Sequence, residues 1–111
     1  MFFVIRSTCP NTDLTIYRAR RRARLQLTLY PQGPAELCLT RYLQENYQMS
    51  LYQACLAILQ NAKFSLNLDR EIIVTIPDPK LNHIARIITY GTGLISGSNI
   101  LRKMLTIKEE S

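Results

Sequence analysis

Residues that build catalytic and metal sites are scarce in this sequence. His83 is the only histidine, and the eight Asp and Glu residues are scattered, with Glu109–Glu110 as the one adjacent pair. A metal site needs several ligands at suitable spacing, and Mg²⁺ chemistry needs clustered carboxylates. No serine or cysteine lies on a recognisable nucleophile turn. The sequence therefore predicts a non-enzymatic protein with no catalytic residue, metal or cofactor, in which His83 has a structural or surface role.

Cysteines are few, and long apolar runs are absent. Cys9, Cys38 and Cys55 are odd in number, widely spaced and without a C-x-x-C pair, which favours buried reduced thiols in a reducing compartment. No apolar run approaches the roughly 18 residues of a membrane-spanning helix, and Met1–Ile5 is too short for the core of a signal peptide. We expect a cytoplasmic protein that does not enter a membrane.

What the sequence has in excess is arginine, within one short segment. Residues 17–24 read Tyr-Arg-Ala-Arg-Arg-Arg-Ala-Arg and hold five of the fourteen Lys and Arg residues. The chain has a formal net charge of +6, whereas the remaining nine basic and eight acidic residues give only +1. Exposed basic clusters most often bind nucleic acid, and sometimes acidic lipid or an acidic protein surface. The alternative is a solvated basic face without a partner.

The conformation of this arginine segment is open from sequence alone. In a strand, one face would carry Arg18, Arg20, Arg22, Arg24, Gln26 and Thr28, and the other Ala19, Arg21, Ala23, Leu25, Leu27 and Leu29. Only Arg21 breaks the alternation. In a helix, alanine and arginine are both favourable, but little apolar surface would anchor the segment. We expect a strand over about Ala23–Tyr30, with the preceding arginines either in that strand or in a mobile arm.

Two amphipathic helices are predicted after the turn at Pro31–Pro34. Pro34 suits the first turn of a helix, where the dipole also favours an acid such as Glu36. The apolar side of this helix is predicted at Leu37, Cys38, Tyr42 and Leu43, opposite Arg41, Gln44 and Glu45. Ser50 is a good N-cap for a second helix that ends near Asn61. Its buried stripe is predicted at Leu51, Ala54, Cys55, Ile58 and Leu59.

The remaining elements predict a small α+β domain over residues 1–111. Alternation and β-branched residues indicate a hairpin over 64–76, preceded by a strand at Phe2–Ile5 and a loop over 7–13. A third helix opens at Asp78 and stops at Gly91, and Ser98 caps a final helix before a frayed tail at 107–111. The strands cluster instead of alternating with helices, which argues against a doubly wound sheet.

The order strand–helix–helix over residues 23–62 resembles that of ribbon-helix-helix DNA-binding proteins. The resemblance covers about 40 of the 111 residues. It implies a dimer whose paired strands enter the major groove, with Arg24, Gln26 and Thr28 at base edges and phosphate bound by backbone N–H groups at Ser50. The alternative is that 23–30 is one strand of an α+β sheet with a solvated polar face.

Three of the four glycines lie in Gly91–Gly97. This segment could form a phosphate-binding nest before the last helix, but it matches neither the P-loop nor the dinucleotide-binding pattern. The alternative is a helix C-cap and an inter-helix turn, which we favour.

Together these features predict a small basic nucleic-acid-binding protein, a dimeric regulatory or accessory factor with DNA preferred over RNA. The arginines at 18, 20, 21, 22 and 24 would contact phosphates, and Gln26 and Thr28 would contact bases. Arg41, Arg86, Arg102 and Lys103 would extend this footprint if the fold brings them to the same side. The alternative is a structural, assembly or protein-interaction module that homo-oligomerises or docks on an acidic protein partner.

Overall fold

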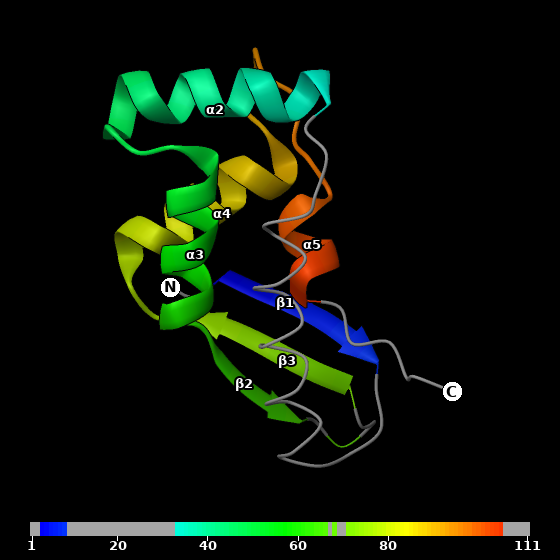
Figure 1. Cartoon of the computed structure of the whole chain (residues 1–111). Coiled ribbons are helices and arrows are strands. Elements are labelled where there is room, and N and C mark those ends of the chain that lie inside the picture. The colour runs from blue at the N-terminus through cyan, green and yellow to red at the C-terminus, as the bar shows by residue number, and fades with distance from the viewer. Residues whose placement is uncertain (1–2, 9–32, 67, 69–70, 106–111) are drawn as a thin grey trace.

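The computed structural model describes residues 3–8, 33–66, 68 and 71–105, and these form a small α+β fold as predicted. The elements in chain order are β1 (Phe3–Thr8), α2 (Pro34–Tyr47), α3 (Leu51–Asn61), β2 (Lys63–Leu66), β3 (Glu71–Ile76), α4 (Pro79–Tyr90) and α5 (Ile100–Leu105). The strands form one sheet and the helices lie together to one side of it (Figure 1). The predicted strand at 23–30 and the predicted frayed tail at 107–111 lie outside the described residues.

The sheet is antiparallel, with the order β1-β3-β2. β2 and β3 form the predicted hairpin, with Lys63 opposite Thr75 and Leu66 opposite Ile72. β1 pairs with the other side of β3 over six residues, from Phe3 opposite Ile76 to Thr8 opposite Glu71. The prediction of a loop from residue 7 is therefore wrong at Ser7 and Thr8. Because β3 supplies pairing partners along its whole length, the ladder continues through residues whose local preference is for turns.

The helix boundaries follow local capping signals. Ser50 Oγ accepts a hydrogen bond from the Gln53 N–H at 3.0 Å, and Asp78 Oδ1 accepts one from the Leu81 N–H at 3.0 Å. At the end of α4, Gly91 adopts a left-handed φ of 78° and its N–H donates to the Ile87 carbonyl. These three predicted boundaries are confirmed.

The buried side of α2 differs from the prediction. Leu39 and Leu43 are fully buried, whereas Leu37 is 58% exposed and Cys38 is exposed. Glu36 shares the buried side because its carboxylate is hydrogen-bonded there, and this rotates Leu37 and Cys38 towards solvent. The prediction of buried thiols is therefore wrong for Cys38.

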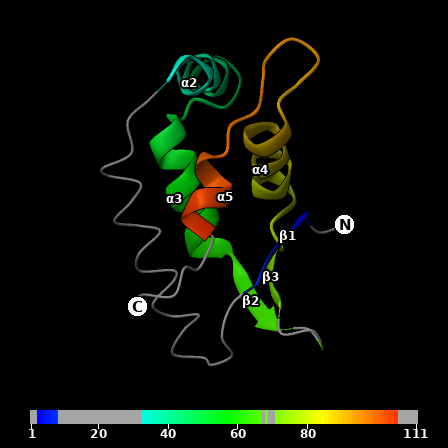
Figure 2. The same cartoon turned by 90° about the vertical axis from the view of Figure 1, so that its right-hand side faces the viewer.

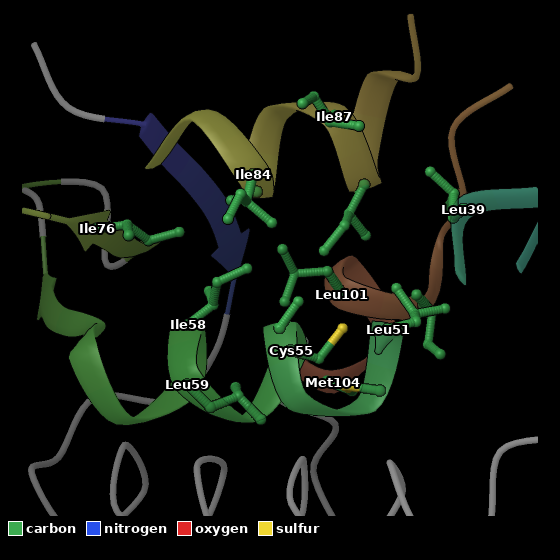
Figure 3. Close-up of a cluster of buried hydrophobic side chains, with 14 of the residues drawn as sticks. Leu39, Leu51, Cys55, Ile58, Leu59, Ile76, Ile84, Ile87, Leu101 and Met104 are labelled. Carbon is green, nitrogen blue, oxygen red and sulfur yellow. The ribbon is translucent and has the colours of Figure 1, made fainter. Parts of the chain in front are cut away.

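The core forms where α3, α4 and α5 meet the sheet (Figure 3). The whole predicted stripe of α3 is buried, including Cys55, whose thiol was expected there. α4 packs on β1, β3, α3 and α5, while α2 packs mainly on α3 and lies farthest from the sheet (Figures 1 and 2). The fully buried side chains include Leu39, Leu51, Ile58, Leu59, Ile76, Ile84, Ile88, Leu101 and Met104. Each contributes about 1.5–3 kcal/mol relative to exposure.

Two asparagines join α4 to its neighbours. The buried Asn82 donates from Nδ2 to the Ile76 carbonyl at 2.9 Å, at the end of β3. Asn61 Oδ1, at the end of α3, accepts from the Asp78 N–H at 3.2 Å. These contacts fix the corner between β3 and α4, and so determine which side of α4 faces away from the core.

Candidate nucleic-acid interface

The residues predicted to bind nucleic acid all lie in the part of the chain that the structure does not describe. Arg18, Arg20, Arg21, Arg22, Arg24, Gln26 and Thr28 fall within 9–32. The strand of the ribbon-helix-helix pattern falls there too. Its two helices are present as α2 and α3, with the predicted order and separation.

After the arginine segment, the described residues resume at Gly33, directly before α2. The start of α2 is held by hydrogen bonds to the carboxylate of Glu36. Glu36 Oε2 accepts from the Gly33 N–H at 3.2 Å, and Glu36 Oε1 accepts from the Ser98 hydroxyl at 2.7 Å. Ser98 Oγ also accepts from the Ile100 N–H at 3.1 Å. Glu36 is 9% exposed and Ser98 6% exposed. These hydrogen bonds hold the first turn of α2 beside Ser98, two residues before α5 begins.

The sequence predicted a helix-dipole role for Glu36 and missed its hydrogen bond to Ser98. The local half of the arrangement has a sequence signal, because a glutamate three residues after an N-cap is typical of a capping box. Gly33 has no side chain to complete the box, so only the glutamate half is formed. The contact with Ser98 spans 62 residues of sequence and has no local signal.

The start of α3 was predicted to hold a phosphate through backbone N–H groups at Ser50. In the structure, the Ser50 N–H donates to Gln53 Oε1 at 2.9 Å, and the Gln53 N–H donates to Ser50 Oγ at 3.0 Å. These two donors are therefore satisfied within the helix. A phosphate at this site would have to displace both side chains.

The other basic side chains named from sequence are spread over three helices. Arg41 on α2, Arg86 on α4 and Arg102 on α5 are exposed, and the backbone of Lys103 lies in α5. The structure does not bring these residues to one helix face. α3, α4 and α5 contain no Asp or Glu. The exposed residues of α4 and α5 therefore include basic side chains and no acidic one.

The solvent side of α4 is the most distinctive surface of the described residues. Its exposed positions are Pro79, His83, Arg86 and Tyr90, spaced i, i+4, i+7 and i+11, with Lys80 beside them. Tyr90 is 63% exposed. The spacing is visible in the sequence, but which side of the helix faces solvent depends on its packing.

A tyrosine from α2 extends this aromatic surface. Tyr47, the last residue of α2, packs edge-to-face against His83, with ring centroids 6.5 Å apart and planes at 63°. Burial, and secondarily Tyr42, raise the pKa of Tyr47 above its ordinary value, so its hydroxyl stays protonated at neutral pH. His83 was predicted to have a structural or surface role, and its side chain is exposed, but the contact with Tyr47 was not foreseen.

The segment Gly91–Gly97 forms a closed turn. The Thr92 N–H donates to the Ile95 carbonyl, the Ser98 N–H donates to the Ile88 carbonyl, and the Leu94 and Ile95 N–H groups both donate to Thr92 Oγ1. A Cβ on Gly97 would lie 2.3 Å from the Thr89 carbonyl oxygen. These N–H groups are directed at the chain itself, which supports the predicted inter-helix turn over a phosphate-binding nest.

The described residues contain no cluster suited to metal chemistry. Within 3–8, 33–66, 68 and 71–105, no group of three or more His, Cys, Asp and Glu side chains could hold a metal ion. Cys55 is fully buried, and burial raises the pKa of its thiol to about 12, so it is unsuited to nucleophilic chemistry. Among these same residues, no helix has the length and apolar character needed to cross a bilayer.

The basis for a function is therefore the charge of the arginine segment and the exposed surface of α4. Comparisons of the chain with protein-family models, with curated proteins and with solved structures find no match.

Proposed function

We propose that this chain is a small, basic, non-enzymatic nucleic-acid-binding protein, a dimeric DNA-binding factor of regulatory or accessory type that acts in the cytoplasm. The observation that carries this proposal is the concentration of five arginines in residues 18–24 of a chain whose remainder has a net charge of +1. Like charges at this density repel one another unless a polyanion or another counter-charge lies close.

The charge of the described body supports this proposal. Of the three acids in the described helices and their caps, Glu36 is buried and bonded to Gly33 and Ser98, Asp78 caps α4, and Glu45 is exposed on α2. The same helices hold five basic residues, so their own acids do not offset the charge of the arginine segment.

Within this proposal, the residues before 33 divide into two roles. Arg18, Arg20, Arg21, Arg22 and Arg24 contact phosphates and supply affinity that does not depend on sequence. Gln26 and Thr28 contact base edges, and in the ribbon-helix-helix arrangement Arg24 would reach a base edge with them, since arginine and glutamine bond guanine and adenine bidentately. The paired strands of two copies would present both sets to one groove.

The test is a titration of fluorescent duplex DNA by anisotropy at several salt concentrations. Wild type is compared with a variant in which Arg18, Arg20, Arg21 and Arg22 are changed to Ser. On duplex DNA the log–log salt slope falls by about 0.9 for each lost phosphate contact, and so by up to about 3.6 for four. A second variant, with Arg24, Gln26 and Thr28 changed to Ala, is expected to lose discrimination between sequences. Absence of duplex binding near physiological salt would refute the proposal.

The second candidate is an assembly or protein-interaction module that docks on a second copy or on an acidic protein. It is favoured by large apolar side chains at the surface, namely Leu37 at 58% exposed and Leu94 at 99% exposed. This candidate predicts a concentration-dependent particle on a sizing column without nucleic acid. The nucleic-acid proposal predicts a dimer whose size does not grow further with concentration.

A further inference from the structure

The solvent side of α4 combines aromatic rings with positive charge in a single stripe. His83, Arg86 and Tyr90 follow one another along the exposed side, and Lys80 lies at its start. At 1.5 Å per residue, His83 and Tyr90 are separated by about 10 Å along the helix axis, with Arg86 between them. A stacked nucleic-acid strand advances about 3.4 Å per nucleotide, so this distance corresponds to about three nucleotides.

The charge of this stripe suits a phosphate backbone. α4 contains no Asp or Glu, and the nearest acid in sequence, Asp78, accepts the Leu81 N–H as the N-cap. The aromatic part is broader than one helix, because Tyr47 of α2 packs edge-to-face on His83. α3 provides a contrast, since its exposed Tyr52 lies on a helix with no charged residue.

We infer that the α4 stripe is a contact surface for single-stranded nucleic acid. Unpaired bases stack on the exposed ring of Tyr90 and on the His83–Tyr47 pair, while Lys80 and Arg86 contact the phosphates. Single-strand binding sites combine a basic track with aromatic side chains on which successive bases stack. A paired base cannot stack in this way, because both of its faces are covered inside the duplex. The surface is therefore distinct from the segment assigned to duplex DNA, although both belong to a nucleic-acid-binding protein.

The test uses anisotropy with a fluorescent single-stranded DNA of about ten nucleotides, within the usual size range of such sites, beside the same sequence as a duplex. Tyr90→Ser is expected to weaken single-strand affinity about fivefold or more, since one lost stacking contact has this effect. Tyr90→Phe keeps the ring and should bind as wild type does. Arg86→Ser should lower the single-strand salt slope by about 0.7.

Matched controls lie on other elements. Tyr52→Ser removes an exposed tyrosine from the uncharged α3, and Lys63→Ser removes an exposed charge from β2, which is on the side of β3 away from β1. Tyr52→Ser should leave single-strand affinity within about twofold, and Lys63→Ser should weaken it less than Arg86→Ser. Circular dichroism and thermal unfolding of every variant confirm that the fold is intact.

The outcomes separate this inference from the proposed function. Unchanged single-strand affinity in Tyr90→Ser, or equal losses in Tyr90→Ser and Tyr52→Ser, would overturn the inference while leaving duplex binding by the arginine segment in place. Duplex binding without single-strand binding would overturn it equally. If single-strand binding survives in the variant lacking Arg18, Arg20, Arg21 and Arg22 but falls in Tyr90→Ser, the α4 surface stands even where the duplex proposal fails.

Discussion

Removing the hydrogen bond between Ser98 and Glu36 tests how strongly α2 is held against the rest of the fold. Ser98→Ala removes the hydroxyl that donates to Glu36 Oε1 at 2.7 Å and that accepts from the Ile100 N–H. A hydrogen bond to a charged group contributes about 1.5–3 kcal/mol, and a lost helix-start bond costs about 1 kcal/mol more. We therefore expect Ser98→Ala to lower the free energy of unfolding by about 2.5–4 kcal/mol.

A double-mutant cycle isolates the part of this loss that belongs to the pair. Glu36→Ala also removes the cap on the Gly33 N–H, so each single change has effects of its own. The sum of the two single losses should exceed the loss in the double variant by about 1.5–3 kcal/mol. Urea unfolding followed by circular dichroism measures all four proteins, and the midpoint shifts give the free energies if the slopes agree.

The control is Ser65→Ala, which removes an exposed hydroxyl from β2. Its effect should stay within about 0.5 kcal/mol. A coupling between Glu36 and Ser98 below about 0.5 kcal/mol would refute the reasoning. It would mean that the carboxylate is equally well satisfied without the hydroxyl, and that α2 is held on the body mainly by Leu39 and Leu43.

Three other perturbations test separate parts of the structure. Gly91→Ala should destabilise the fold by several kcal/mol in thermal unfolding, because φ of Gly91 is +78° and an added Cβ would lie 2.1 Å from the Ile95 carbonyl oxygen. A loss below about 1 kcal/mol would contradict the close approach of the Ile95 carbonyl to Gly91. Ser50→Ala removes the N-cap bond of α3 and should cost about 1 kcal/mol in the same assay, and wild-type stability would show that the capping box is not formed in solution. Burial raises the pKa of the Cys55 thiol from its ordinary value of 9.0 to about 12. As pH rises above about 9, the thiol therefore loses its proton in the unfolded state before it does so in the folded state. The free energy of unfolding should fall by about 1.4 kcal/mol at pH 10 as a result. This extra fall should be absent from Cys55→Ala, and a thiol reagent should label Cys38 in the folded protein while Cys55 reacts only on unfolding.

The helix boundaries and the hairpin could be predicted because their signals are local. Ser50 and Asp78 each form an N-cap bond within three residues, and Gly91 ends α4 through its own left-handed φ. The buried stripe of α3 was predicted correctly because Leu51, Ala54, Cys55, Ile58 and Leu59 recur at i, i+3, i+4, i+7 and i+8, which places them on one helical face. In these places, residues close in sequence determine the local structure.

The orientation of α2 was predicted only in part. Leu37, Cys38, Tyr42 and Leu43 were expected on its apolar side, whereas the structure buries Leu39 and Leu43 and exposes Leu37 and Cys38. Glu36 lies on the buried side with Leu39 and Leu43, and its partner Ser98 lies 62 residues away, which no local signal indicates. Likewise, β1 extends through Ser7 and Thr8 because β3 pairs with it, which the residues themselves do not indicate.

The candidate sites divide in the same way. By itself, the sequence determined that this is an α+β chain with its positive charge concentrated at residues 18–24, since composition and charge spacing need no fold to be counted. It also determined the caps and turns, which are made by neighbouring residues. Only the tertiary structure decided that Tyr47 meets His83 and that Glu36 meets Ser98. The physical reason is that burial and contact depend on which elements pack together, and that packing is set by residues far apart along the chain.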